Sequence, residues 1–260
     1  TVNDLTVAGA KPMYISAGFI IEEGLSLDVL DKIIVSMKQA AEKAGVMIVT
    51  GDTKVVEKGS ADRIFINTSG IGIFHENLSI ENDISPGDKI LINGSIGNHG
   101  IAVMIARNEL KLQSNIASDT APLNLLILPL LEKYPSEIKF MRDVTRGGLA
   151  TVLNEICGHR EFGITVKEKQ IPIDDDVKAV CEILGLDPLY IANEGKAIFV
   201  VRADAADEIL DIMRSLPYGE NAAIIGEISE MNKSRVVMRT GIGTGRIIDM
   251  PTGEQLPRIC

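Results

Sequence analysis

Three aspartates in short polar stretches beside apolar sequence have the side-chain type that binds a hard metal ion. Asp4 lies in VNDL, Asp52 in TGDTK and Asp143 in RDVTRGG. Mg²⁺ takes one or two protein carboxylates and completes its octahedron with water and phosphate oxygens. Aspartates in polar turns of separate segments could therefore form a magnesium–nucleotide site together. Capping accounts for them equally well, because aspartate at a strand–helix junction commonly accepts backbone N–H groups.

Two further charged residues have types that suit catalysis. Lys54 follows Gly51-Asp52-Thr53, where its ammonium could reach a phosphate held by the same loop. Glu194 lies in IANEGKAIFV, directly before an apolar stretch, where burial could raise the pKa of its carboxyl toward the working range of a general base. A solvated surface charge is the simpler interpretation of each residue taken alone.

The three cysteines differ in their surroundings. Cys157 and Cys181 lie among apolar residues in predicted helices, so we expect both in the core. Cys260 is the last residue, and a thiol on a tether of about ten residues can sweep up to ~33 Å. Because the thiolate is the nucleophile, we expect a mobile chemical handle there, with an incidental end residue as the alternative. The spacing of the three fits neither a metal site nor a disulfide framework, which predicts a reducing, cytoplasmic location.

Glycine-rich and histidine-containing segments give weaker signals. GSIGNHG at 94–100 and TGIGTGR at 240–246 resemble turns that cradle a phosphate, but turns need glycine for steric reasons alone, and we favour that interpretation. His75, His99 and His159 show no ligand spacing and are expected to be structural.

The elements that must position these residues alternate between helices and strands. Apolar residues recur at helical spacing between Ser26 and Gly45, which predicts a helix with Ser26 as its N-cap and Gly45 as its stop. Turn residues near Asp83 predict a domain boundary. We therefore expect an α/β protein with domains over 1–83 and 84–247 and a flexible tail over 248–260.

Composition narrows the function classes. The 260 residues are 45% hydrophobic, enough to bury a core in two domains. With 36 acidic and 26 basic side chains the net charge is −10, which argues against general affinity for nucleic acid or anionic membrane. No apolar run reaches the ~20 residues that span a bilayer, and no basic-then-apolar leader opens the chain. We expect a protein that is neither inserted nor exported.

Several motifs together resemble one family. TVNDL…GAKP, GDTKVV, SPGDKIL, DVTRGGLA, ANEGKAI and above all the terminal GEQLPRIC closely resemble hydrogenase maturation proteins of the HypE family, in order along nearly the whole chain. More broadly, the chain is similar to the PurM-like ATP-binding superfamily of aminoimidazole ribonucleotide synthetase and selenophosphate synthetase, whose members lack the cysteine tail. The resemblance implies a two-domain α/β (α+β) fold whose N-terminal sheet pairs with its copy in a homodimer. The family's glycine-rich nucleotide segment would precede Thr1, so we expect an N-terminal domain truncated at its start and a catalytically incomplete chain.

The resemblance also implies an activity. In this family the carbamoyltransferase HypF loads the terminal thiol as a thiocarboxamide, and ATP converts it to a thiocyanate. The cyanide then passes through the HypC–HypD scaffold complex to the iron of NiFe hydrogenase. Cys260 would carry the substrate, Lys54 would position phosphate or thiocarboxamide, and Glu194 would handle the proton.

The remaining implied roles concern ATP and Mg²⁺. The metal role falls on Asp4 and Asp143, and supporting nucleotide contacts fall on Asn3, Asp52 and Thr53. Two alternatives stay open: a noncatalytic interaction module whose tail docks maturation partners, and another ATP-dependent synthetase or kinase of the superfamily.

Overall fold

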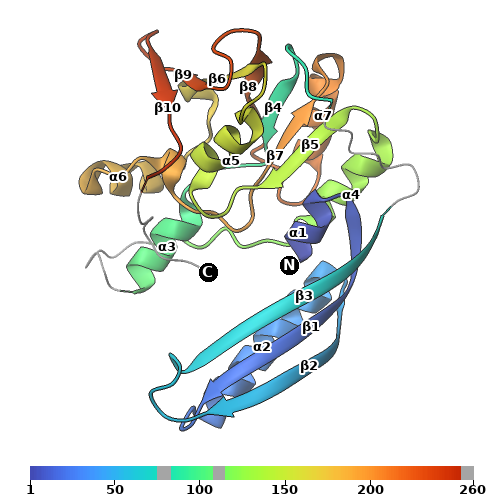
Figure 1. Ribbon diagram of the computed structural model, residues 1–260, viewed down its shortest axis with the longest axis vertical. Helices are drawn as coiled ribbons and strands as arrows, with labels where there is room; N and C mark the ends of the chain where they lie inside the picture. The colour runs from blue at the N-terminus through green and yellow to red at the C-terminus, as the bar shows by residue number, and fades with distance from the viewer. Residues whose placement is uncertain (75–82, 108–114, 253–260) are drawn as a thin grey trace. The chain divides into compact units, whose positions relative to one another are not determined.

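The computed structural model describes residues 1–74, 83–107 and 115–252 (Figure 1). The chain folds into two compact units, 1–76 and 77–260, and each is described by itself. Unit 1 contains, in chain order, α1 (Val2–Val7), β1 (Ala10–Glu22), α2 (Leu27–Ala44), β2 (Met47–Val56) and β3 (Ile64–Phe74).

The sheet of unit 1 has the strand order β2-β1-β3, with β2 parallel and β3 antiparallel to β1. The crossover from β1 to β2 is α2, which begins after Ser26 and ends at Gly45 in the left-handed conformation (φ 67°), as the sequence predicts. Ala41 and Ala44 of α2 pack with Ile15 of β1, so α2 covers one face of this sheet.

Unit 2 contains a seven-stranded sheet of order β10-β9-β6-β8-β4-β7-β5. All neighbouring pairs are antiparallel except β6 and β9. Its strands are β4 (Lys89–Ile92), β5 (Ile138–Asp143), β6 (Gly163–Lys167), β7 (Ala197–Val201), β8 (Ala223–Ser229), β9 (Val236–Arg239) and β10 (Gly245–Ile248). Its helices are α3 (Asn98–Ala106), α4 (Asn124–Lys133), α5 (Gly148–Cys157), α6 (Asp175–Leu184) and α7 (Ala206–Ser215), with short 3₁₀ turns η1 (Glu168–Gln170), η2 (Pro188–Tyr190) and η3 (Ala203–Ala205).

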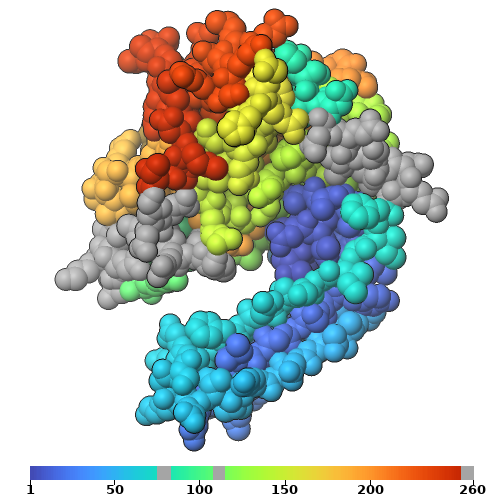
Figure 2. Space-filling view, in the orientation of Figure 1, coloured from blue at the N-terminus to red at the C-terminus, as the bar shows by residue number. Residues whose placement is uncertain are grey.

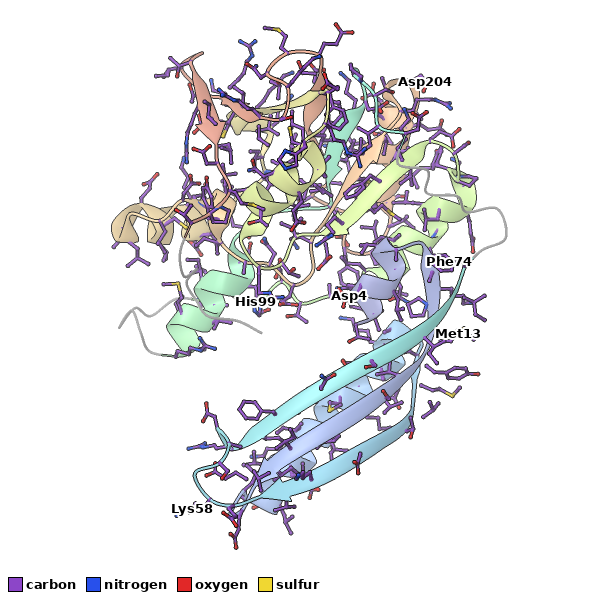
Figure 3. The ribbon with its side chains drawn as sticks, in the orientation of Figure 1. Asp4, Met13, Lys58, Phe74, His99 and Asp204 are labelled. Carbon is purple, nitrogen blue, oxygen red and sulfur yellow. The ribbon has the colours of Figure 1, made fainter. Side chains whose placement is uncertain are left out.

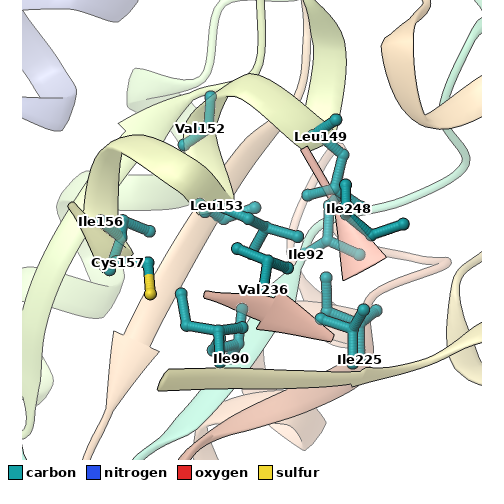
Figure 4. Close-up of a cluster of buried hydrophobic side chains, with 14 of the residues drawn as sticks. Ile90, Ile92, Leu149, Val152, Leu153, Ile156, Cys157, Ile225, Val236 and Ile248 are labelled. Carbon is teal, nitrogen blue, oxygen red and sulfur yellow. The ribbon is translucent and has the colours of Figure 1, made fainter. Parts of the chain in front are cut away.

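The core of unit 2 lies on both sides of its central strands. All five residues of β7 are buried, which explains why AIFVV reads as a continuous apolar run rather than an alternating one. Leu149, Val152 and Leu153 of α5 pack over this sheet beside Ile90 and other apolar side chains (Figure 4). The fold is therefore the mixed α/β architecture that the sequence predicts.

The local predictions for the three aspartates are wrong. None of them lies in a polar turn: Asp4 is within α1, Asp52 is within β2, and Asp143 is the last residue of β5. The polar run GDTK stays in strand conformation because it remains paired with β1 as far as Val56. The turn predicted within 240–246 is present and connects β9 to β10, where the Thr240 N–H donates to the Thr244 carbonyl at 2.9 Å.

Candidate functional site

In unit 1, the strand register decides which candidate residues share a face. Asp52 and Lys54 lie opposite Gly18 and Ile20 of β1, so their side chains project from the same face of the sheet. Thr53 alternates to the other face, which α2 covers. The Thr53 N–H donates to Asp52 Oδ1 at 2.8 Å.

The helix α1 lies on the α2 side of this sheet. Val2 packs on the cluster of Ile15, and a Cβ placed on Gly70 would lie 2.7 Å from Leu5 Cδ1. Asn3 and Asp4 belong to α1, where Asp4 is exposed (Figure 3). Within unit 1 the structure therefore does not bring Asp4 together with Asp52 and Lys54, because they belong to opposite sides of the sheet.

In unit 2, Asp143 and Glu194 come to the same end of two neighbouring strands. Asp143 closes β5 and lies opposite Ala197, the first residue of β7, and Glu194 precedes Ala197 by three residues. The Val144 N–H donates to the Lys196 carbonyl at 2.8 Å, which extends the strand pairing into the loop of Glu194. The Asp143 carboxylate is mostly buried, with Arg142 Nε 3.8 Å from its Oδ1.

Two buried asparagines that the sequence analysis did not single out hold the loop 193–197. The Gly97 N–H donates to Asn193 Oδ1 at 2.7 Å, and Asn193 Nδ2 donates to the Ile191 carbonyl. Asn93 Nδ2 donates to the Gly195 carbonyl at 3.1 Å, and Asn93 Oδ1 accepts the Ala197 N–H at 2.8 Å. Because both amides are buried and bonded to backbone, they fix the path of the chain on either side of Glu194.

A third residue absent from the sequence-based set is Asp119. Its Oδ1 accepts the Glu194 N–H at 3.0 Å, and its Oδ2 lies 3.5 Å from Lys196 Nζ. The neighbouring Ser118 Oγ is 2.8 Å from Nδ1 of His99, which lies in the first turn of α3 (Figure 3). Burial lowers the pKa of His99, and the Asp119 charge partly offsets this. His99 thus supports the loop through Ser118, in line with its predicted structural role.

The glycines of 94–100 make a close-packed turn before α3. Gly97 is the N-cap of α3 with φ 90°, and its N–H is already bound by Asn193. A Cβ on Gly100 would lie 2.5 Å from Ile191 Cγ2. The structural interpretation of this segment is confirmed at these two glycines, which allow α3 to approach the loop of Glu194.

Both cysteines in the described part of the chain are core residues, as predicted. Cys157 is the last residue of α5 and lies among aliphatic side chains (Figure 4). Burial raises the pKa of the Cys157 thiol, and burial together with the nearby Asp187 charge raises that of Cys181 to about 11. Neither forms a useful amount of thiolate near neutral pH. Cys260 lies outside the described residues.

The chain leaves the last strand from a fixed point. Asn154 Nδ2 of α5 donates to the Ile248 carbonyl at 3.0 Å, and the Tyr190 hydroxyl of η2 donates to the Asp249 carbonyl at 2.9 Å. Tyr190 belongs to the same segment as Glu194, four residues earlier. The root of the C-terminal tail is therefore bound to the stretch that leads into the Glu194 loop.

The donor chemistry of the candidate metal ligands fits Mg²⁺. Asp4 and Asp143 offer carboxylate oxygens, the hard donors that this ion prefers. No group of three or more histidine, cysteine, aspartate or glutamate side chains able to hold a metal occurs within 1–74, 83–107 and 115–252. One or two carboxylates with phosphate and water oxygens would suffice for Mg²⁺.

Two family models cover most of the chain. The model described as AIR synthase related protein, N-terminal domain, matches residues 1–74, and that for the C-terminal domain matches 85–239. The class is therefore that of the PurM-like ATP-using proteins. Thiamine monophosphate kinase from Aquifex aeolicus has the same fold, with a TM-score of 0.64 at 16% identity.

Closer relatives identify the family within this class. Carbamoyl dehydratase HypE of Rhizobium leguminosarum bv. viciae is 48% identical over all of this chain and 75% of its own length, and that of Escherichia coli (strain K12) is 42% identical over all of this chain and 76% of its own. A crystal structure of HypE in complex with ATP superposes with a TM-score of 0.92 at 45% identity, covering all of this chain and 79% of that one. HypE in a HypE–HypF complex gives 0.91 at 52% identity, covering 96% and 82%. The chain belongs to the HypE family of carbamoyl dehydratases.

Among the helices that the structure describes, none combines the length and apolar character needed to cross a membrane.

Proposed function

We propose that this protein uses ATP to dehydrate a thiocarboxamide on its own Cys260 to a thiocyanate, supplying cyanide for the iron of NiFe hydrogenase. The supporting observation is that Asp143 and the loop of Glu194 lie at the same end of β5 and β7, with the Glu194 N–H bound by Asp119. A second support is that Cys157 and Cys181 are buried with raised thiol pKa values, which makes them poor carriers.

The reaction balances with ATP as co-substrate. The carboxamide oxygen attacks the γ-phosphorus and ADP leaves, so the oxygen becomes part of a phosphate leaving group. Loss of the N–H protons and of that phosphate then gives the nitrile, so that R–S–CO–NH₂ and ATP yield R–S–C≡N, ADP and phosphate. The chemistry requires cations to offset phosphoryl charge and a base to accept the amide proton.

The residues of this chain divide these tasks. Glu194 accepts the amide proton, since its backbone is held by Asp119 and its carboxylate is the acidic group of the loop. Lys54 offers its ammonium to the phosphoryl oxygens. Asp143 and Asp4 would hold Mg²⁺, which when bound neutralises phosphate charge. Asn3, Asp52 and Thr53 would assist nucleotide binding.

Partners follow from the same assignment. HypF would load Cys260, as the HypE–HypF complex of a relative suggests, and HypC–HypD would receive the cyanide. Free buried thiols at Cys157 and Cys181 agree with a reducing, cytoplasmic setting.

The homodimer would form through the sheet of unit 1. Tyr14, Ile20, Phe65 and Ile71 are exposed apolar residues that register places on the face opposite α2. No helix of unit 1 covers this face in the space-filling view (Figure 2). An exposed apolar sheet face of this kind favours association with a second surface.

The stoichiometry of ATP consumption tests the proposal. The protein is first loaded by HypF with carbamoyl phosphate, then separated and mixed with ATP. We expect one ADP and one phosphate per loaded Cys260, and none above background from unloaded protein. ATP hydrolysis at the same rate with and without loading of Cys260 would favour another synthetase or kinase. Tight binding of the partners without any ATP hydrolysis would favour a docking module.

A further inference from the structure

Asp119 contacts two residues of the Glu194 loop from a distant part of the chain. Its side chain is 5% exposed, and Oδ1 accepts the Glu194 N–H at 3.0 Å. The 14% exposed Lys196 places its ammonium 3.5 Å from Oδ2. A single buried carboxylate thus binds the residues on both sides of Gly195.

The backbone of the two segments is also in close contact. A Cβ at Gly195 would lie 1.9 Å from the Asp119 carbonyl oxygen and 2.9 Å from Ala121 Cβ. Only glycine permits this approach. The loop and residues 119–121 are therefore in direct backbone contact, and Ser118 Oγ lies within hydrogen-bonding distance of His99 Nδ1 (2.8 Å) and Thr120 Oγ1 (2.7 Å).

The charge of Asp119 is costly for a residue with a packing role alone. In the described part of the chain its buried Oδ2 accepts no hydrogen bond, and the Lys196 ammonium compensates it electrostatically. A buried carboxylate that is not fully hydrogen-bonded costs free energy that an amide or hydroxyl would not.

We propose that Asp119 is a positioning residue for Glu194. It holds the Glu194 backbone at the N–H so that the carboxylate meets the amide proton of the Cys260 thiocarboxamide in a reactive geometry. The proposal rests on the proposed function, because it assumes Glu194 as the base. A displacement of about 1 Å at a reacting group can cost roughly 10²-fold in rate, so loss of this hydrogen bond should slow dehydration by about 10–10²-fold.

The test compares two variants of similar size. Asp119→Asn keeps a carbonyl oxygen that can accept the Glu194 N–H, whereas Asp119→Leu removes the acceptor; both remove the charge facing Lys196. Asp119→Ala replaces the leucine variant should that fail to fold. We expect dehydration of preloaded protein to fall about 10–10²-fold in the leucine variant and to be largely retained in the asparagine variant, with loading by HypF unchanged in both.

A matched control lies elsewhere in unit 2. Asp88 is also 5% exposed and pairs with a 14% exposed lysine, Lys139, at 2.9 Å. Its carboxylate otherwise bonds to Ser85, so within the described part of the chain it contacts no residue of the Glu194 loop. Asp88→Leu should lower stability to a similar extent and leave the dehydration rate of the folded protein unchanged. Equal rate losses in the Asp119 and Asp88 leucine variants, or none in either, would overturn the positioning role.

A readout that does not use activity separates this proposal from the proposed function. Hydrogen exchange of the Glu194 amide, followed by NMR, should be at least tenfold faster in Asp119→Leu than in the parent, Asp119→Asn or Asp88→Leu. Unchanged exchange would refute the positioning of Glu194 by Asp119, whatever the activity of the variants. If exchange is faster in Asp119→Leu but not even the parent protein dehydrates Cys260, the hydrogen bond between Asp119 and Glu194 stands and the proposed function is rejected instead.

Discussion

Gly195→Ala should disrupt the site through backbone contact alone. The new Cβ would lie 1.9 Å from the Asp119 carbonyl oxygen, whereas real Cβ contacts stay above 3.0 Å, so the two backbones must separate by about 3.0 − 1.9 = 1.1 Å. The Gly195 carbonyl is held by a buried hydrogen bond from Asn93 Nδ2, and Asp119 is tied to the loop by the bond that its carboxylate accepts from the Glu194 N–H. Overpacking of this kind costs typically 1–3 kcal/mol, and we expect about 3 kcal/mol here because the obstacle is backbone.

Two assays measure the consequence. For a unit of this size about 3 kcal/mol corresponds to a Tm lower by roughly 6–12 °C in calorimetry. A shift of about 1 Å in the Glu194 loop should also slow dehydration of preloaded Cys260 by roughly 10²-fold at a temperature where the variant is folded. Gly94→Ala is the control, because its Cβ would meet only ordinary contacts, the nearest being Lys196 Cε at 3.6 Å. If Gly195→Ala melts within 1 °C of Gly94→Ala and dehydrates equally fast, the close packing of 119 and 195 is not what holds the loop.

Three further predictions concern single side chains. Glu194→Gln should load normally but dehydrate about 10²–10⁴-fold more slowly, and an unchanged single-turnover rate would assign the base elsewhere. Asp143→Asn should weaken Mg-ATP binding in calorimetric titration at nearly constant volume; equal affinity in a folded variant would remove Asp143 from the metal site. For Cys181, burial raises the thiol pKa from 9.0 to about 11, so the folded state holds the proton more tightly than the unfolded state. The free energy of unfolding should therefore fall between pH 9 and 11, by up to about 1.4 kcal/mol per pH unit, and Cys181→Ala should show a shallower decline in denaturant titrations.

Local signals in the sequence identify much of the fold. The helix α2 is predictable because its apolar spacing, Ser26 and Gly45 all lie within one stretch of chain. The buried strand β7 is equally readable from five consecutive apolar residues. The strand conformation of GDTK cannot be predicted in this way, because a polar edge strand resembles a turn until its pairing with β1 is known.

Only those candidate site residues that belong to a recognisable sequence motif could be predicted. Glu194 and Asp143 stand out by type and position, and the structure places Asp143 at the end of β5 and Glu194 in the loop that leads into the neighbouring strand β7. Asp119, Asn93 and Asn193 carry no local signal, because the partners that define their roles are distant in the sequence. Asp119 binds Glu194 across 75 residues, and Asn193 binds Gly97 across 96. Asn93 binds Gly195 across 102 residues and Tyr218 across 125. The role of such polar residues depends on tertiary contacts, so it can be recognised only in the folded structure.

Mass spectrometry of the C-terminal peptide tests directly whether Cys260 carries the substrate through dehydration. After incubation with HypF, carbamoyl phosphate and ATP, we expect the peptide to gain one carboxamide and then to lose one water, while Cys260→Ala remains folded and gains neither. A carboxamide found on Cys157 or Cys181 with Cys260 unmodified, or a carboxamide on Cys260 that persists in the presence of ATP, would contradict it.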